Sequence, residues 1–374
     1  MDCLNLEQML CEPKKINYHT VQMEELKRSK RPSFVFGGGG GINTSKLLCE
    51  NGVNVAGFVE SASYYKPGKK ILGKPVYSYD DFCEPEKRNL IFAATGKNIL
   101  QVAENEQKLG NNTYFFDYLG YFYDMSYEWV LEHVVELQDT FDLLEDELSR
   151  ETFLSFIDYK AKCVKVEVRP LWKLWRCDQY YNDLYNFHGF KMHAMVDCGA
   201  WIGDTSMDYL DFLQKAGISG KVYAFEPDPD SFVKLKENAA ARGNIECYNY
   251  AVGSETKQVI FSAGGSGASH LSQNGEGVEV SMVRADDIIL DKPTSMIKMD
   301  LEGSEVDALC GLKSTISKNA PNLAVCVYHK IDDLIKIPQY IRSLVQDTGI
   351  EYKYYLRHHS TTLVETVFYG IPQK

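Results

Sequence analysis

Acidic residues follow short, mostly apolar runs at three places in the second half of this chain. Asp197 and Glu226 each end such a run, and Asp300 and Glu302 follow a third. These runs are typical of buried parallel strands, whose carboxyl ends meet at the edge of the sheet where α/β proteins bind ligands. His329 follows a fourth run. Carboxylates and an imidazole at one edge can bind the hydroxyls of a ligand and accept a proton.

Two glycines follow the first of these acids. Gly199 and Gly203 separate it from an amphipathic pattern that predicts a helix over 206–213. A strand, a tight glycine turn and a helix form the usual cofactor pocket of an α/β sheet. A Cβ at either glycine would collide with a ligand lying against the backbone. The turn alone is a moderately specific signal of a cofactor site, and the acids at the ends of the next strands make that prediction more specific.

Glu226 stands roughly 25 residues beyond the turn, where the second strand of such a sheet ends. A bound nucleoside presents its ribose there, and two vicinal hydroxyls can donate to one carboxylate. Pro227 stops the strand, and Asp230 or Ser231 can cap the next helix. We therefore expect Glu226 to bind a ribose.

A second glycine-rich turn lies near the start of the chain. Five glycines, Gly37–Gly41, follow a short apolar run, and Glu60 ends the next one. This layout is typical of dinucleotide binding, but the GxGxxG pattern does not close. A nucleotide or nucleotide-sugar pocket with Gly39, Gly40 and Glu60 is one interpretation. The other, which we favour, is a Rossmann-like scaffold whose glycines only form a tight turn.

The composition indicates a soluble protein of two domains. The chain has 374 residues, of which 44% are hydrophobic and 25% charged, values typical of globular proteins. Its net charge is −12, which argues against nucleic acid as a partner because binding phosphates requires clustered Lys and Arg. No apolar run approaches the about 20 residues of a membrane span.

The ten cysteines are scattered and never form a Cys-x-x-Cys pair, so zinc-ribbon and thioredoxin sites lack their spacing. The opening residues show no secretory leader. We therefore expect reduced thiols and a cytoplasmic location.

We divide the chain into an α/β domain over 1–120, a helical connector over 121–192 and a second α/β domain over 193–374. Helical spacing of apolar residues predicts one or two helices over 127–148. The connector is rich in aromatic side chains that suit a substrate pocket, a core between domains or the surface of a homodimer, and we favour the last two: Trp172, Trp175, Tyr180, Tyr181, Tyr185 and Phe187. Tyr181 and Tyr185 are the best candidates for a pocket.

In the last domain we expect five parallel strands, ending near residues 197, 225, 253, 300 and 327, with an antiparallel excursion over 259–281. A closing antiparallel pair at 352–359 and 363–369 completes a sheet of seven strands. The motifs Asp197-x-Gly199-x-x-x-Gly203, Phe225-Glu226-Pro227-Asp228 and Lys298-x-Asp300-x-Glu302-Gly303-x-Glu305 resemble those of FkbM-type S-adenosylmethionine-dependent methyltransferases. The resemblance covers about the last 190 residues, with the motifs in the family's order.

The resemblance implies a class I, Rossmann-like methyltransferase domain that methylates a hydroxyl of a saccharide, a glycan or a natural-product precursor. It implies that Asp197 lies near the ammonium of the cofactor, that Glu226 holds the ribose and that Ala251 lies by the adenine. The full set of cofactor-binding residues that it implies is Asp197, Gly199, Ala200, Gly203, Asp204, Thr205, Glu226, Pro227, Ala251 and Asp300.

Methyl transfer to a hydroxyl is helped by a base or a metal, because a sugar hydroxyl is a poor nucleophile. We expect His329 to be the base, with Asp300 and Glu302 beside it, since histidine ordinarily titrates at about 6.5. Asp300 can equally bond the cofactor or orient the next helix. A divalent ion held by both carboxylates and one histidine is chemically reasonable, but we favour a site without metal. Of His358 and His359, at most one faces the site.

Two other functions compete with methylation. One is a nicotinamide-dependent oxidoreductase or epimerase that uses Gly37–Gly41, which the open glycine pattern and the missing Tyr-x-x-x-Lys pair oppose. The other is a non-catalytic cofactor-binding partner in glycan assembly.

Overall fold

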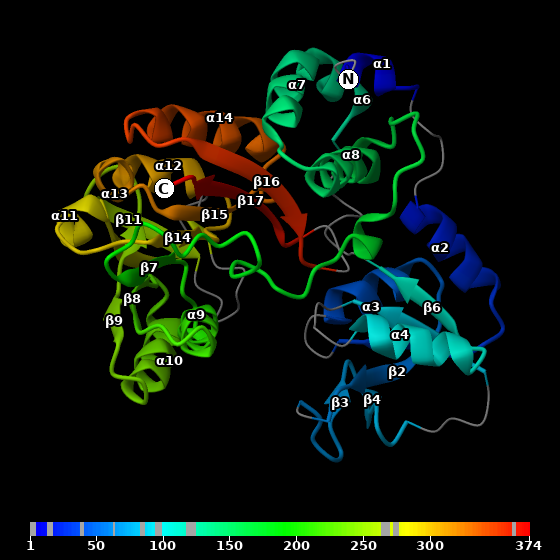
Figure 1. Cartoon of the computed structure of the whole chain (residues 1–374). Coiled ribbons are helices and arrows are strands. Elements are labelled where there is room, and N and C mark those ends of the chain that lie inside the picture. The colour runs from blue at the N-terminus through cyan, green and yellow to red at the C-terminus, as the bar shows by residue number, and fades with distance from the viewer. Residues whose placement is uncertain are drawn as a thin grey trace. The chain divides into compact units, whose positions relative to one another are not determined.

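The computed structural model describes residues 5–12, 18–37, 41–62, 64–82, 87–93, 99–116, 125–262, 270–271, 277–360 and 364–374. The chain forms two compact units (Figure 1). The first comprises Met1–Val134, Glu151–Cys177 and His358–Glu365, and the second comprises Val135–Arg150, Asp178–Arg357 and Thr366–Lys374. The domain boundaries near 120 and 192 stay predictions.

The second unit is built on the expected seven-stranded sheet. Its strands follow the order β16-β17-β15-β14-β7-β8-β9. The five strands from β15 to the edge strand β9 pair in parallel, and β17 runs antiparallel to β15. The strands are β7 (His193–Cys198), β8 (Gly220–Phe225), β9 (Ile245–Tyr248), β14 (Met296–Met299), β15 (Asn322–Cys326), β16 (Tyr352–His358) and β17 (Thr366–Pro372).

Amphipathic helices cover this sheet. Ser206, Tyr209, Leu210 and Leu213 are buried along α9, at the spacing that places them on one helical face. Helices α9 and α10 contact β7, β8 and β9, and α11 to α14 contact one another (Figure 1). The helices are α9 (Asp204–Lys215), α10 (Pro229–Ala240), α11 (Asp286–Ile289), α12 (Glu305–Gly311), α13 (Lys313–Asn319) and α14 (Asp333–Gln346).

The chain segment between β9 and β14 forms a separate four-stranded sheet, ordered β10-β13-β11-β12. The antiparallel excursion is confirmed, since β11 runs antiparallel to β13. The expected third parallel strand ending near residue 253 is wrong: the third strand is β9, and Ala251 starts β10 in the smaller sheet. The strands are β10 (Ala251–Val252), β11 (Lys257–Ser262), β12 (His270–Leu271) and β13 (Val278–Val283).

The first unit contains a six-stranded sheet ordered β3-β4-β2-β1-β5-β6. All its pairings are parallel except that of β3 with β4, which confirms the mixed α/β, Rossmann-like layout. The strands are β1 (Ser33–Phe36), β2 (Val55–Glu60), β3 (Lys70–Ile71), β4 (Lys74–Ser78), β5 (Asn89–Phe92) and β6 (Asn112–Phe115), with helices α1 (Leu6–Met9), α2 (Tyr18–Arg28), α3 (Gly41–Glu50) and α4 (Ile99–Lys108).

Among the described residues, three α-helices lie between β6 and β7 in the sequence, whereas one or two were expected over 127–148. They are α6 (Tyr127–Glu132), α7 (Val134–Leu143) and α8 (Glu147–Ala161), followed by the short 3-10 helix η1 (Leu171–Lys173). Ser126 caps α6 by accepting a hydrogen bond from the Trp129 backbone N–H. Within the described part of the chain, no helix combines the length and the apolar character that crossing a bilayer requires.

Candidate active site

The turn after β7 brings backbone from two strands together. Gly199 adopts φ +80°, and its amide donates to the carbonyl of Phe225 at 3.1 Å. A Cβ on Gly199 would lie 2.1 Å from the carbonyl oxygen of Asp300. The protein itself therefore excludes a side chain at residue 199, because the turn packs against the backbone that follows β14. The expectation that a ligand alone requires this glycine is too narrow.

Gly203 ends the turn and begins α9. It adopts the left-handed conformation at the N-cap, with φ +84°, which glycine enters without the steric cost that a Cβ imposes. Asp204 is exposed in the first turn of the helix, and Thr205 is half-buried. The backbone carbonyl of Thr205 accepts a hydrogen bond from the Tyr181 hydroxyl. The sequence-predicted residues of this turn thus lie together at the start of α9.

Asp197 lies beneath the turn and is fully buried. Its Oδ2 accepts a hydrogen bond of 2.6 Å from Ser206, and its Oδ1 lies 3.2 Å from Lys298 Nζ. Lys298 also donates to the carbonyl of Gly199 at 2.8 Å. Burial alone would lower the pKa of Lys298, but the charges of Asp197 and Asp300 outweigh burial and raise it. Asp197 is thus committed to an internal ion pair, and its role toward a cofactor stays a prediction.

Glu226 ends β8 as a buried carboxylate, with 6% of its surface exposed. Its Oε2 accepts from the Trp201 amide and its Oε1 from the Asp228 amide, each at 2.8 Å. Burial, followed by the charge of Asp228, raises the pKa of Glu226 to about 7. Each carboxylate oxygen has a further lone pair, so this fixed group retains the capacity to accept hydroxyl donors.

Residues around this strand end refine the prediction. Asp228, rather than Asp230 or Ser231, caps α10, since it accepts hydrogen bonds from both of their amides. Pro227 is buried. Asn249 donates to the carbonyls of Glu226 and Pro227 at 2.8 and 3.1 Å and fixes the strand end. Sequence reasoning gave Asn249 no role, although an asparagine directly after β9 is a signal for such a lock. Ala251 is buried in β10.

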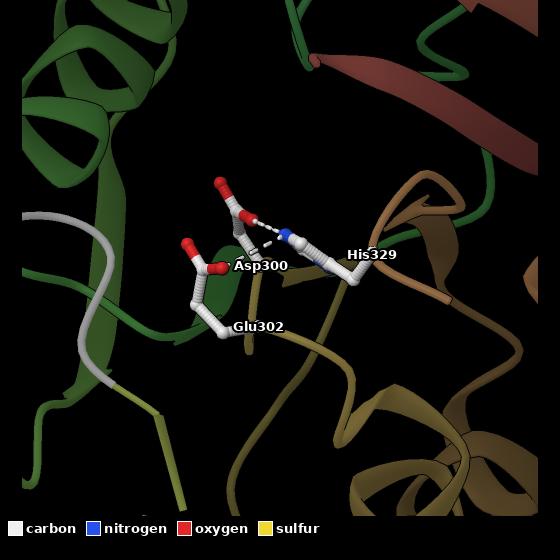
Figure 2. A group of neighbouring side chains, drawn as sticks. All are labelled: Asp300, Glu302 and His329. Atoms are coloured by element: carbon white, nitrogen blue, oxygen red, sulfur yellow. Dashed lines mark ion pairs between the residues drawn. The ribbon is translucent and has the colours of Figure 1, made fainter. Parts of the chain in front are cut away.

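Asp300, Glu302 and His329 converge on one point at the carboxyl ends of β14 and β15 (Figure 2). His329 Nε2 lies 3.3 Å from Asp300 Oδ1 and 3.7 Å from Glu302 Oε2. Glu302 adopts φ +51°, a conformation that costs a non-glycine residue free energy and is concentrated at functional sites. The sequence-predicted catalytic residues are therefore brought together. We call these three residues the acidic triad.

Glu305, at the start of α12, supports this arrangement. Its Oε1 lies 2.8 Å from His329 Nδ1 and accepts a hydrogen bond of 2.9 Å from the Leu301 amide. The carboxylate is buried and therefore fixes both the imidazole ring and the turn after β14. The sequence motif contained Glu305, but no role was assigned to it.

The charges of these groups are strongly coupled. Burial alone would lower the pKa of His329, but contacts with Asp300 and Glu305 raise it well above its ordinary value. Burial alone would raise the pKa of Asp300, but the hydrogen bond from His329 and the charge of Lys298 hold it well below its usual range. At neutral pH the pair is thus an imidazolium beside a carboxylate.

Two tyrosines orient Asp300. Tyr180 donates to Oδ2 at 3.1 Å and Tyr328 to Oδ1 at 3.2 Å. The sequence favoured Tyr181 and Tyr185 instead. Tyr185 is buried in the hydrophobic core and contacts Tyr209, which agrees with the core role that the sequence favoured for these aromatic residues over a pocket. The sequence placed Tyr180 in the aromatic cluster of the connector, but nothing in that pattern distinguishes it from the neighbouring tyrosines.

The remaining candidates lie in the first unit. Glu60 forms an ion pair with Lys69, whose Nζ is 2.6 Å from Oε1. Gly39 and Gly40 fall outside the described residues, so both interpretations of this turn, a nucleotide pocket and the favoured scaffold, stay predictions. His358 and His359 are buried, and His359 Nδ1 lies 2.8 Å from the carbonyl of Arg176 within the same unit.

The chain is similar in sequence and in fold to known methyltransferases. The family model described as "Methyltransferase FkbM domain" matches residues 197–351. The hexuronic acid methyltransferase AglP of Haloferax volcanii is 22% identical over 197 residues, covering 50% of this chain and 79% of the relative. A crystal structure of methyltransferase FkbM from Methylobacillus flagellatus matches with a TM-score of 0.57 and 20% identity, covering 95% of this chain and 94% of that one.

Proposed function

We propose that this chain, in which residues 197–351 match the FkbM methyltransferase domain, transfers the methyl group of S-adenosylmethionine to a hydroxyl of a sugar or of a glycan precursor. The observation that supports this most directly is the convergence of the acidic triad at the sheet edge. Carboxylates at such an edge suit the recognition of a hydroxyl-rich acceptor. The likeness to a hexuronic acid methyltransferase points to the same class of acceptor.

In this proposal the turn from Gly199 to Gly203 passes under the methionine part of the cofactor. Glu226 accepts hydrogen bonds from the ribose hydroxyls, for which its carboxylate is already fixed by two backbone amides. Ala251 lies toward the adenine. Asp197 acts on the cofactor's ammonium through the turn that it supports with Lys298.

The transfer itself is a displacement at carbon. The acceptor oxygen forms a bond to the methyl group, the bond from that carbon to sulfur breaks, and the sulfonium becomes a neutral thioether. The protein must hold the three atoms in line at near-attack distance. The proton of the hydroxyl must leave to a nearby base.

We assign that proton to Glu302 in place of His329. When no cation is bound, the contacts with Asp300 and Glu305 that raise the pKa of His329 favour its protonated form, which has no lone pair at Nε2 to accept the proton. Glu302 is 30% exposed, and its second carboxylate oxygen points away from His329 (Figure 2). In this assignment His329 and Asp300 position the acceptor, and Glu302 receives the proton.

No described residue favours the nicotinamide-dependent alternative. Its ribose-binding acid would be Glu60, which is engaged by Lys69. The glycine turn of that alternative falls largely outside the described residues.

The test is a labelled-methyl transfer screen with the full chain. Acceptors are nucleotide sugars and glycan fragments, offered in pairs that carry either a uronate or the matching neutral sugar. We expect the label on a sugar oxygen and a preference for the uronate. Transfer only to a nitrogen or carbon acceptor, or to none of the saccharides while the cofactor binds, would refute the proposed acceptor class.

A further inference from the structure

We infer that the acidic triad binds a divalent cation of the Mg²⁺ and Mn²⁺ class, and that this ion holds the acceptor oxygen. The second part rests on the proposed function. The first depends only on the described side chains Asp300, Glu302 and His329.

The spacing of the ligand atoms suits such an ion. Nε2 of His329 lies 3.3 Å from Asp300 Oδ1 and 3.7 Å from Glu302 Oε2, and all three atoms lie within 4.8 Å of one another. Octahedral Mg²⁺ with bonds of about 2.1 Å places neighbouring ligands about 3 Å apart. Small adjustments of two side chains would therefore close the shell on three adjacent positions. The opposite positions stay open for water or an acceptor.

The imidazole is supported as metal-binding histidines usually are. A ligating histidine commonly gives its other ring N–H to a carboxylate, which fixes the tautomer and directs the free nitrogen at the metal. Glu305 Oε1 lies 2.8 Å from Nδ1, and Nε2 faces the two carboxylates (Figure 2). The side chain of His329 is 6% exposed, so packing also fixes the orientation of its ring.

The first carboxylate is equally well oriented. Tyr180 and Tyr328 donate to the two oxygens of Asp300 at 3.1 and 3.2 Å. Outer contacts of this kind hold a ligand in place before the ion arrives. Two carboxylates with one imidazole form an oxygen-rich donor set, which suits Mn²⁺ and Mg²⁺ better than the softer metals.

Charge balance supports the same inference. Three carboxylates, those of Asp300, Glu302 and Glu305, meet around one imidazole. Whichever form the imidazole takes, the group has an excess of negative charge in a half-buried place, and such an excess is costly without a counter-charge. A bound dication would supply it, and the proton on Nε2 would be released as the ion binds. It would also lower the pKa of a coordinated hydroxyl and make it a better nucleophile.

Mn²⁺ alone is the probe, because the free ion gives an electron paramagnetic resonance signal that weakens when it binds. We titrate the full chain with Mn²⁺ in the absence of cofactor and acceptor. The wild-type chain should bind one ion, and Glu302→Gln and His329→Ala should weaken binding at least tenfold. Glu305→Gln alters the residue that supports His329 and the turn after β14, without changing a proposed ligand, and should weaken binding about 10–100-fold. Asp332→Asn is the matched control, since Asp332 pairs with Lys336 on the surface and should leave binding unchanged.

Circular dichroism and thermal melting first establish that each variant is folded. The cation site would be overturned if the wild-type chain bound no Mn²⁺, or if Glu302→Gln and His329→Ala bound Mn²⁺ as tightly as the wild-type chain. The methyl-transfer screen with and without EDTA separates the two proposals. Metal binding without any saccharide methylation would reject only the acceptor class, and methylation that is insensitive to EDTA in a chain that binds no Mn²⁺ would reject only the cation.

Discussion

Lys298 Nζ lies 3.2 Å from Asp197 Oδ1, and the two residues stand directly opposite each other in the register of β14 and β7. Both are buried, with side-chain exposures of 3% and 0%. The ion pair therefore joins the two central strands directly beneath the turn that begins at Gly199. It also places a positive charge near Asp300, whose pKa it helps to lower.

Lys298→Met should destabilise the second unit by about 3–5 kcal/mol, because it leaves the charge of Asp197 buried without its partner. Urea unfolding followed by circular dichroism measures the change. The double variant Lys298→Met with Asp197→Asn removes both charges and should recover part of the loss. If the single and double variants were equally unstable, the cost would come from packing rather than from the unpaired charge.

Much of the fold followed from the sequence, because most of the parallel strands are local apolar runs followed by a polar residue. The acids at the strand ends, Glu226 and Asp300, followed from the same local pattern. The missed residues act across the sheet. Lys298 matters through its register with Asp197, and Tyr180 reaches Asp300 across 120 positions of the sequence. No periodicity within a short window reports such pairings.

The third strand shows a different limit. The residues 249–253 read as a strand, and Ala251 and Val252 are indeed extended. They pair with β13, however, in the smaller sheet. Local pattern identifies an extended segment, but partner choice is set by the turns around it. Here Asn249 binds the end of β8 and separates β9 from β10.

Glu226→Ala should weaken S-adenosylmethionine binding tenfold or more, since charge-assisted hydrogen bonds contribute roughly 1.5–3 kcal/mol each. Isothermal titration calorimetry measures the affinity. Asp230→Ala is the control, because Asp230 is exposed in the first turn of α10 and its side chain has no assigned contact with the cofactor. Unchanged affinity in Glu226→Ala would remove Glu226 from the ribose site.

Cofactor affinity should also depend on pH. Burial raises the pKa of Glu226 to about 7, and only the ionised carboxylate accepts hydrogen bonds from both ribose hydroxyls. Protonation below this pKa therefore weakens binding, by up to about tenfold for each pH unit. Calorimetry at pH 6, 7 and 8 should show affinity rising with pH and levelling above 7. Glu226→Gln has no charge to lose and should show a flatter profile, whereas a profile as steep as that of the wild type would assign the effect to another group.

Glu302→Gln tests the assignment of the base. It should lower kcat about 10²–10⁴-fold, the usual contribution of a general base, and leave cofactor affinity close to that of the wild type. Calorimetry measures cofactor affinity, and steady-state kinetics with the acceptor identified in the screen are run at saturating Mn²⁺, so that a fall in kcat reports the loss of the base and not the loss of the proposed cation. Glu255→Gln is a matched control, because Glu255 is exposed and pairs with Lys257. If kcat of Glu302→Gln stayed close to the wild-type value, Glu302 would not be the base and another residue would have to accept the proton.

Gly199→Ala tests whether the turn needs glycine for internal reasons. The new Cβ would lie 2.1 Å from the carbonyl of Asp300, and φ is +80°. Left-handed strain and overpacking together should cost roughly 2–5 kcal/mol. Gly217→Ala has a similar φ of +73° with nothing within 4 Å, so it should cost only the strain, about 1–2 kcal/mol. Urea unfolding compares the two variants.

The carbonyl that the new Cβ meets belongs to the residue that His329 contacts, so relief of the clash must move Asp300. Gly199→Ala should therefore reduce methyl transfer even where the protein remains folded, and Gly217→Ala should not. Equal stability of the two variants would mean that the turn after β7 yields easily. In that case the closeness of Gly199 to β14 would not explain the glycine, and the ligand itself would remain its explanation.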